Sequence, residues 1–367
     1  MRTHILPAVF LFTLSLFTSA AELPSGLQGL GLRESAQASR DLPGWEKPTR
    51  IVVRNIFGQD LAAQLGAGLS GVEVVGVSTV AEARAAIAGA QGLVGFCDQE
   101  IFDAADQLHW VQVYWAGVED CVSEPAMAAG KIVLSNGQRL SGPAIAEHTL
   151  GLMFAMTRGL NNYYQAQLEQ RWQPSYSVSP AGRGEVAGAT MLVVGLGGIG
   201  TQVAERAHGL GMRVLATRGS RRSGPDYIEY VGLADEAPEL ARQADVVVNA
   251  APLTPATEGM FNASFFAAMK PSAYFISVGR GQSTVTADLI AALRKGEIAG
   301  AALDVTDPEP LPDDHEAWSV PGLIITPHVA AQSPESLQRI GLLVAENMRR
   351  YVSGEPLLSV VNVERGY

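Results

Sequence analysis

Residues 191–200 read Met-Leu-Val-Val-Gly-Leu-Gly-Gly-Ile-Gly, and this stretch decides the fold. An apolar, β-branched run leads into three glycines, and the segment Thr201-Gln-Val-Ala-Glu-Arg-Ala that follows has the apolar spacing of a helix. The order strand, tight turn, helix predicts a dinucleotide-binding turn. A second apolar strand, Arg213-Val-Leu-Ala-Thr217, follows one helix length later, as a βαβ unit requires.

Each glycine of this turn has its own physical reason. Gly195 permits the sharp turn, Gly197 lets the backbone approach a pyrophosphate, and Gly200 lets helix and strand pack closely. The phosphates would lie at the helix N-terminus, where free N–H groups and the helix dipole attract anions. The cofactor-binding residues predicted in the turn are Gly195, Leu196, Gly197, Gly198, Ile199 and Gly200.

Length and composition narrow the class of protein. A chain of 367 residues predicts about two domains. With 47% hydrophobic and 17% charged residues, an α/β globular protein is expected. The formal net charge of −11 argues against nucleic acid as a partner, because binding a polyanion needs a basic face.

The N-terminus has the pattern of a secretory signal. Arg2 and His4 precede an apolar run from Ile5 to Phe17, and the small residues of Thr18-Ser-Ala-Ala21 suit signal cleavage. The run is too short to span a bilayer comfortably, so residues 1–21 are expected to be removed and no stable membrane anchor is expected. An exported protein, periplasmic or secreted, is favoured. The alternative is a cytoplasmic protein whose start codon is misassigned or whose first helix is buried.

The cysteine content predicts neither a metal site nor a disulfide framework. The chain contains two cysteines, Cys97 and Cys121, without Cys-x-x-Cys or Cys/His ligand spacing, so zinc and iron–sulfur sites are not expected. Export would allow the two to form a disulfide, but two small apolar residues packed in loops or core are favoured.

Alternating strand and helix patterns divide the chain into domains. Residues 22–48 lack sustained periodicity and are predicted to be a tail, and 49–150 with 326–367 form a domain that is split in the sequence. A single long helix is expected from Pro143 to about Gln170, and residues 151–325, including this linking helix, form the NAD(P)-binding domain. We therefore expect an α/β fold with two Rossmann-like domains and parallel sheets.

Short motifs are spread along residues 50–367. They are Ala116-Gly-Val-Glu119, Ile145-Ala-Glu-His148, Gly195 to Gly200, Pro252-Leu-Thr-Pro-Ala-Thr-Glu-Gly259, Met269-Lys-Pro271, Val278-Gly-Arg-Gly281, Ala302-Leu-Asp-Val305, Pro308-Glu-Pro310 and Thr326-Pro-His328. These motifs resemble, in the same order, those of the D-isomer-specific 2-hydroxyacid dehydrogenase family, nearest to its glyoxylate/hydroxypyruvate reductase members, and their number makes the resemblance specific. The resemblance implies an active site in an interdomain cleft and a homodimer to which the long helix contributes.

The resemblance assigns Arg280, Glu309 and His328 as the catalytic set. Reduction of a 2-oxo acid delivers hydride to the carbonyl carbon while negative charge builds on the oxygen, so it needs a proton donor and an electrophilic clamp. His328 would protonate that oxygen, and Glu309 would orient the imidazole and stabilise its charged form. Arg280 would hold the substrate carboxylate and carbonyl oxygen with its planar donors.

Further residues follow from the same resemblance. Backbone N–H groups at Ala116 and Gly117 are expected to bind the substrate carboxylate, while Pro252 and Asp304 contact the nicotinamide end of the cofactor. The family commonly has Asn where Ser277 stands, in the strand before Arg280. The histidines that match no catalytic position, predicted to pack or to lie in a loop, are His148, His208 and His315.

The residues after the second strand favour NADP(H) over NAD(H). An NAD-preferring fold places an acidic residue there to bond the ribose 2′-hydroxyl, but the sequence is Thr217-Arg-Gly-Ser-Arg-Arg-Ser223 and the first acid is Asp226. Arg218, Arg221 or Arg222 would bind a 2′-phosphate, and Thr217 is a further predicted cofactor-binding residue. The alternative is a solvated basic loop.

The sequence thus predicts an NADPH-dependent reductase of a small 2-oxo acid of the glyoxylate or hydroxypyruvate type. The competing hypothesis is a dinucleotide-binding sensor or interaction protein that keeps the fold without catalysis. The complete catalytic set favours the enzyme, whereas the signal-like segment favours the sensor, because an exported compartment should be poor in NADPH.

Overall fold

A computed structural model of the chain describes residues 23–363, apart from 43, 57–59 and 173–183. The chain forms two compact units: unit 1 comprises Met1–Gly137 and Arg339–Tyr367, and unit 2 comprises Gln138–Gln338. The first unit is therefore split in the sequence. The expected signal peptide, residues 1–21, lies outside the described residues.

Unit 2 is built on one parallel sheet of seven strands in the order β13-β12-β11-β10-β7-β8-β9. Counted from β7, this is the 3-2-1-4-5-6 order of dinucleotide-binding domains extended by one strand, with the switch point between β7 and β10. The strands are β7 (Thr190–Val194), β8 (Arg213–Arg218), β9 (Tyr230–Leu233), β10 (Val246–Asn249), β11 (Tyr274–Ser277), β12 (Gly300–Leu303) and β13 (Leu323–Ile325).

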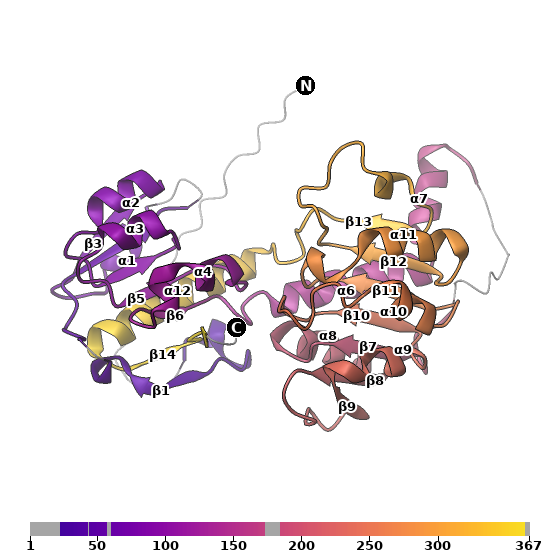
Figure 1. The fold of residues 1–367 in the computed structure, drawn as a ribbon, viewed down its shortest axis with the longest axis horizontal. Coiled ribbons are helices and arrows are strands. Elements are labelled where there is room, and N and C mark those ends of the chain that lie inside the picture. Colours follow the sequence, from indigo (N-terminus) through magenta and orange to yellow (C-terminus); the bar gives the residue numbers. More distant parts are fainter. Residues whose placement is uncertain (1–22, 43, 57–59, 173–183, 364–367) are drawn as a thin grey trace. The chain divides into compact units, whose positions relative to one another are not determined.

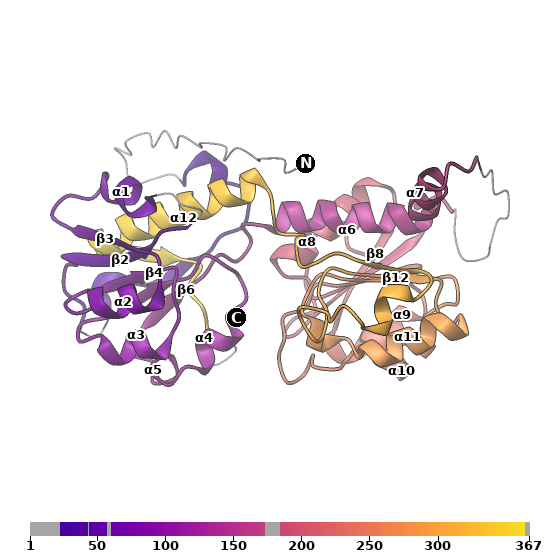
Figure 2. The same cartoon turned by 90° about the horizontal axis from the view of Figure 1, so that it is seen from above.

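Helices cover both faces of this sheet (Figure 2), so its central strands are apolar on both sides. Helices α6 and α8 pack on one face around Met153 and Val203. Helices α9, α10 and α11 pack on the other around Leu240, Phe266 and Leu289. The helices of unit 2 are α6 (Gly142–Thr157), α7 (Leu160–Leu168), α8 (Gly198–Gly209), α9 (Ala237–Ala241), α10 (Ala263–Ala268) and α11 (Thr286–Lys295), with 3₁₀ turns at Ala234–Glu236, Gly281–Ser283 and Glu316–Ser319.

The single long helix expected from Pro143 to Gln170 is two helices. Between α6 and α7, Gly159 adopts a left-handed conformation with φ 64°, which a helix cannot continue through. Because the apolar spacing persists across the glycine, the sequence pattern alone did not locate the break. The prediction of one helix was wrong.

Unit 1 contains a parallel five-stranded sheet in the order β3-β2-β4-β5-β6. Counted from β2, this is the doubly wound order 2-1-3-4-5, with a switch point between β2 and β4. Helices lie on both faces (Figure 2), with α1 and α12 on one and α2, α3 and α5 on the other. The strands are β2 (Arg50–Arg54), β3 (Glu73–Val77), β4 (Gly92–Val94), β5 (Trp110–Gln112) and β6 (Val133–Ser135), and the helices are α1 (Leu61–Gly66), α2 (Val80–Ala86), α3 (Gln99–Ala104), α4 (Glu119–Ser123), α5 (Pro125–Ala128) and α12 (Pro334–Ser353).

Residues 23–42 belong to the folded body of unit 1 instead of forming a tail. Strand β1 (Glu34–Ala38) pairs antiparallel with β14 (Pro356–Leu358), so two segments far apart in the sequence lie side by side in one small sheet (Figure 1). Leu27, in the 3₁₀ turn Ser25–Leu27, is fully buried. The tail prediction was wrong because the strand shows no apolar alternation and its partner lies at the other end of the chain.

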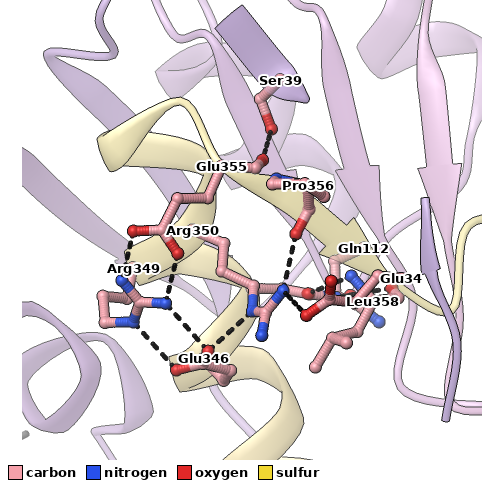
Figure 3. Close-up of polar contacts among 10 residues, drawn as sticks. Glu34, Ser39, Gln112, Glu346, Arg349, Arg350, Glu355, Pro356 and Leu358 are labelled. Carbon is pink, nitrogen blue, oxygen red and sulfur yellow. Dashed lines mark hydrogen bonds and ion pairs between the residues drawn. The ribbon is translucent and has the colours of Figure 1, made fainter. Parts of the chain in front are cut away.

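Ion pairs between charged side chains connect β1 to α12 (Figure 3). Arg350 donates to Glu346 at 2.6 Å and to Glu34 at 2.7 Å, while Arg349 bridges Glu346 and Glu355. Burial raises the pKa of Glu346, but hydrogen bonds from Arg349 and Arg350 outweigh burial and leave it below its usual value. The Arg349 hydrogen bond likewise lowers the pKa of Glu355.

Cys97 and Cys121 form a disulfide, with their Cα atoms 5.5 Å apart. The expectation of two unpaired apolar cysteines was therefore wrong. Cys97 lies in the loop after β4 and Cys121 lies in α4, and the parallel pairing of β4 and β5 brings these two following segments together. Their separation of 24 residues in the sequence carried no signal of this contact.

The boundary between the units differs from the expected one. Residues 138–150 and 326–338, which the sequence assigned to the split domain, lie in unit 2. Helix α6 packs on α8, β11 and β12, which explains the first shift. The second follows from the hydrogen bonds that tie the residues after β13 to Asp304. In the described part of the chain, no helix has both the length and the apolar character needed to cross a membrane.

Candidate active site

The candidate residues of unit 2 lie at one edge of its sheet. Arg280 follows β11, Asp304 follows β12, and His328 follows β13, and these three strands are adjacent and parallel. The glycine turn follows β7 and Pro252 follows β10, on either side of the switch point. Carboxyl ends of parallel strands at a switch point form the usual ligand site of such sheets.

The turn after β7 has the geometry predicted for two of its glycines. Gly195 has φ 97°, and a Cβ built on it would lie 2.6 Å from the Ala251 backbone. A Cβ on Gly200 would overlap the carbonyl of Gly195, so helix and strand pack too closely for any side chain there. Close contacts with the backbone therefore exclude any larger residue at Gly195 and at Gly200.

Gly197 has a different environment, which bears on the fit of a dinucleotide. Apart from its neighbours in the sequence, none of the described residues has an atom within 4 Å of a Cβ built on Gly197, so packing does not explain this glycine. Helix α8 begins directly after it, and the first N–H groups of a helix, here on Gly198, Ile199 and Gly200, have no partner within the helix. The free space beside Gly197 and the first N–H groups of α8 together fit a pyrophosphate.

Leu196 and Thr217 shape this turn from within the protein. The Thr217 carbonyl accepts hydrogen bonds from the N–H groups of Gly195 (3.2 Å) and Leu196 (2.9 Å). The side chains of Leu196 and Thr217 are buried. Both residues therefore tie the turn to the end of β8, which aligns the two segments that follow adjacent strands.

The basic residues after β8 have different surroundings. Arg222 donates to Glu236 at 2.8 Å and to the Tyr230 hydroxyl at 2.9 Å. The Arg222 and Leu233 hydrogen bonds hold the pKa of Glu236 at about 2, so this carboxylate stays charged. Arg222 thus already has a counter-charge, whereas Arg221 is exposed and forms no ion pair within the described residues. Arg218, at the end of β8, is half-buried.

His328 and Glu309 form a close pair. The Nδ1 atom of His328 lies 2.5 Å from Oε1 of Glu309, and the two side chains are 44% and 41% exposed. A carboxylate at this distance receives the Nδ1 hydrogen, which leaves Nε2 for a second partner. The predicted acid–base pair is therefore assembled and accessible.

Asp304 holds the turn that carries His328. Its backbone carbonyl accepts from the His328 N–H at 2.8 Å, and its carboxylate accepts from the N–H groups of Val329 and Ala330, each at 3.0 Å. His328 has φ 53°, a left-handed conformation that a non-glycine residue adopts at a cost. Asp304 is 3% exposed, and its hydrogen bonds stabilise this strained turn.

A buried polar cluster positions the backbone of Arg280. Asn249, at the end of β10, donates to Ser277 at 3.0 Å and to Ser283 at 2.7 Å, and it accepts from the Ala251 N–H. Ser283 in turn donates to the Arg280 carbonyl at 2.6 Å. Ser277, where the family commonly has Asn, lies directly across from Asn249 in the sheet. The amide of Asn249 therefore acts from the neighbouring strand.

The turns that carry Arg280 and Glu309 are in direct contact. A Cβ built on Gly281 would overlap the carbonyl of Thr306, so only glycine fits beside Arg280. Arg280 itself is half-buried and donates to the Gly279 carbonyl at 3.0 Å. The turns after β11, β12 and β13 thus present a cation, a carboxylate and an imidazole along one edge.

Ala116 and Gly117 lie in unit 1, in the loop between β5 and α4. The Ala116 carbonyl accepts from Asn136 Nδ2 at 2.6 Å, which braces the loop. Within the described residues, neither the Ala116 nor the Gly117 N–H group donates a hydrogen bond. Ala116 is exposed and Gly117 is partly buried, so two consecutive backbone donors lie at the surface of unit 1.

The other histidines differ from each other. His208 stacks on Tyr227, with ring centroids 5.2 Å apart, as a packing residue does. His315 accepts from the Ala317 N–H at 3.2 Å and caps a 3₁₀ turn in its loop. His148 is more than a packing residue, because its Nε2 lies 3.0 Å from Thr326 Oγ1. Asn249 was not among the residues predicted for the site, although it is a polar residue that ends the buried run Val246-Val-Val.

Comparisons with known proteins agree with this geometry. Residues 150–330 match the sequence model of the D-isomer specific 2-hydroxyacid dehydrogenase NAD-binding domain. The chain is 31% identical over 283 residues to a human protein named glyoxylate reductase/hydroxypyruvate reductase. The aligned residues cover 76% of this chain and 86% of the relative.

Two solved structures share the fold. One is an NADPH-dependent glyoxylate/hydroxypyruvate reductase from Sinorhizobium meliloti in complex with NADP and sulfate, with 27% identity, a TM-score of 0.74, and coverage of 87% of this chain and 100% of the other. The second is a D-isomer specific 2-hydroxyacid dehydrogenase from Xanthobacter autotrophicus in complex with NADPH and MES, with 26% identity, a TM-score of 0.74, and coverage of 87% and 100%.

The two parallel sheets, the dinucleotide turn, the assembled histidine–carboxylate pair and the similarity over three quarters of the chain lead to one conclusion. This chain belongs to the D-isomer specific 2-hydroxyacid dehydrogenase family, whose members are oxidoreductases that act on CH–OH groups with NAD(P).

Proposed function

We propose that this protein reduces a small 2-oxo acid, of the size of glyoxylate or hydroxypyruvate, with NADPH. The observation that carries the proposal is the pair His328–Glu309 at 2.5 Å, on loops adjacent to the turn of Arg280. A proton donor, its orienting carboxylate and a cation are the groups that carbonyl reduction needs. The human relative's name supports the substrate class.

The chain's own groups would handle charge and protons. Arg280 holds the 2-oxo acid and places positive charge beside the carbonyl oxygen. His328 donates its Nε2 proton to that oxygen as it becomes an alkoxide, and Glu309 stabilises the ring through Nδ1 in both protonation states. When bound, the dihydronicotinamide supplies the hydride.

The exposed N–H groups at Ala116 and Gly117 are proposed to bind the substrate carboxylate. The Asn136 side chain fixes the loop from the Ala116 carbonyl, which pre-organises these donors. Pro252, exposed after β10, and Asp304 are proposed to contact the nicotinamide end of the cofactor. The Asp304 Oδ2 atom accepts one hydrogen bond, from Ala330, in the described structure, and a carboxylate oxygen has room for another.

We propose NADPH as the preferred cofactor because of the residues after β8. Arg218 and Arg221 would bind the 2′-phosphate, and the segment from Thr217 to Pro225 lacks an acidic residue that would bind a 2′-hydroxyl. Arg222 is paired with Glu236, so it is less suited than Arg221, which forms no ion pair within the described residues. The two structural relatives solved with NADP or NADPH support this choice.

We propose that two copies of the chain associate through α7. Leu160, Tyr164 and Leu168 lie four residues apart on one face of this helix and are 52%, 60% and 59% exposed. An exposed apolar stripe of this kind is typical of an interface, and a two-fold axis would pair the stripe with itself.

We propose that the protein is exported and folds in an oxidising compartment. The signal-like pattern of residues 1–21 and the disulfide between Cys97 and Cys121 support this localisation, since disulfides persist outside the reducing cytosol. A cell fractionation of the full chain, with thiol titration of the recovered protein, tests it. Protein with two free thiols in the cytosol would contradict the proposal.

A spectrophotometric assay tests the activity directly. The protein from residue 22 onward is incubated with NADPH or NADH and with glyoxylate, hydroxypyruvate or pyruvate. We expect turnover with a small 2-oxo acid and a preference for NADPH of about tenfold or more, which corresponds to about 1.4 kcal/mol. Saturable NADPH binding without turnover on any 2-oxo acid would instead indicate a sensor or binding protein.

A further inference from the structure

His148 lies on α6 and reaches the segment that leads to His328. Its Nε2 atom is 3.0 Å from Thr326 Oγ1, and Thr326 Oγ1 is 2.6 Å from Asp304 Oδ1. Asp304 then binds the N–H groups of Val329 and Ala330 on the far side of His328. A continuous chain of hydrogen bonds therefore links a helix to the turn of the proposed acid–base residue.

The direction of these hydrogen bonds follows from the number of hydrogens. The Asp304 carboxylate accepts two backbone N–H bonds, so Thr326 must give it the single hydrogen of its hydroxyl. The lone pairs of Thr326 Oγ1 then accept from His148, and Nε2 of His148 must carry a hydrogen. The hydrogen-bond network therefore assigns the ring hydrogen of His148 to Nε2.

Asp304 needs this support because it is almost fully buried. A carboxylate with 3% exposure is stable only when its oxygens are paired, and the described structure pairs them with Thr326, Val329 and Ala330. The Nε2–H of His148, 3.6 Å from Oδ1, adds favourable charge–dipole interaction. Without His148, the Thr326 hydroxyl is free to rotate away from Asp304.

We propose that His148 is a positioning residue that, through Thr326 and Asp304, holds His328 in its left-handed turn. The inference rests on the proposed function, since it gives His328 the proton transfer. His148 does not itself transfer the proton; it acts through Thr326 and Asp304. Its role is to keep the His328 ring where Nδ1 meets Glu309 and Nε2 meets the substrate.

Kinetic variants test the proposal. We expect His148→Leu and Thr326→Val each to lower kcat about tenfold, while KM for the 2-oxo acid and for NADPH stays within about twofold, because a misplaced proton donor affects the chemical step. His148→Gln, whose amide nitrogen can replace Nε2, and Thr326→Ser, which keeps the hydroxyl, should retain most of the rate. His208→Leu, which removes a stacked histidine of the same unit, is the matched control and should leave kcat unchanged.

The double variant His148→Leu/Thr326→Val separates a shared pathway from two independent losses. Both substitutions break the same series of hydrogen bonds from His148 to Asp304. The kcat of the double variant should therefore equal that of Thr326→Val alone. Additive losses, equal losses in the Gln and Leu variants, or an unchanged kcat in His148→Leu would each overturn the proposal.

A spectroscopic measurement keeps the test independent of turnover. NMR of histidine-labelled protein reports the Nδ1–H resonance of His328, which the short hydrogen bond to Glu309 shifts downfield. We expect this resonance to shift or broaden in His148→Leu and to return in His148→Gln. If the wild-type protein reduces no 2-oxo acid, the proposed function fails, and this resonance still decides the positioning role. An unchanged resonance in His148→Leu would overturn it.

Discussion

His328 Nδ1 lies 2.5 Å from Glu309 Oε1, although the two residues come from loops that follow different strands, β13 and β12. The pair forms because these strands are adjacent and parallel, so their carboxyl ends meet at one edge. It depends equally on Asp304, which fixes the backbone on which His328 is carried. The catalytic geometry is thus a property of the sheet edge as a whole.

Removing either member of this pair should affect kcat far more than cofactor binding. We expect His328→Ala to lower kcat by about 10³-fold, since general acid catalysis is lost. Glu309→Gln keeps an acceptor for Nδ1 but loses the charge, so the expected loss is smaller, about 10- to 100-fold. Steady-state kinetics together with NADPH binding by protein fluorescence provides the measurement, and a loss of NADPH binding in either variant would contradict the assignment.

The basic residues after β8 should determine the cofactor. We expect Arg218→Ala/Arg221→Ala to raise KM for NADPH by about 10- to 100-fold, the range expected for a lost charge-assisted hydrogen bond of about 1.5–3 kcal/mol. The KM for NADH should change little. Arg222→Ala is the control, because Arg222 is already bonded to Glu236 and Tyr230. A larger effect from Arg222 than from the other two would reverse the assignment.

Asn249 should matter for both stability and rate. Asn249→Leu leaves buried groups of Ser277, Ser283 and Ala251 without their partner, and we expect a loss of about 2–4 kcal/mol in the free energy of unfolding. Ser283→Ala breaks the hydrogen bond to the Arg280 carbonyl. It should lower kcat/KM with a smaller loss of stability. Denaturant unfolding and kinetics on the same preparations separate the effect on stability from the effect on rate. Equal stability of the wild type, Asn249→Leu and Ser283→Ala would contradict a structural role for the polar cluster around Asn249.

The stripe on α7 should control the oligomeric state. We expect Tyr164→Glu/Leu168→Glu to halve the mass measured by light scattering, because two carboxylates would have to be buried at the interface. Asn162→Glu adds a charge on another face of the same helix and should leave the mass unchanged. A wild-type protein that is monomeric at all concentrations would rule out the proposed dimer.

The ion pairs of α12 should make stability depend on acid. The folded-state pKa values of Glu346 and Glu355 lie below the ordinary value of 4.5, so their contribution is present above that pH and is lost as the pH falls through the folded values. Glu355→Gln should therefore cost about 1 kcal/mol at pH 7. The difference in stability between the variant and the wild type should shrink as the pH falls below 4.5. A difference that stays constant with pH would show that the carboxylate charge is not involved.

Local patterns predicted the parts of this protein whose geometry is local. The turn after β7 could be predicted because Gly195 and Gly200 are demanded by contacts within the same strand, turn and helix. The parallel sheets followed from alternating strands and helices. Arg280, Glu309 and His328 came from the family resemblance, since nothing in their individual spacing brings them together.

Features that depend on distant pairing could not be predicted in this way. The strand Glu34–Ala38 has no apolar alternation, and its partner is a segment at the other end of the chain. The Cys97–Cys121 contact arises from the order of β4 and β5 in the sheet. His148 lies on a helix whose spacing indicates packing, and its partner Thr326 becomes its neighbour only when the sheet has formed.

The pairing of β1 with β14 also has a consequence for how the chain folds. Glu34 and its partner Arg350 are 316 residues apart, so unit 1 cannot close until the segment that contains Arg350 and β14 has been synthesised. Unit 2 is continuous in the sequence and is complete earlier. Synthesis from the N-terminus therefore produces a finished dinucleotide-binding unit while β1 is still unpaired, and the synthesis of β14 is the step that allows unit 1 to fold.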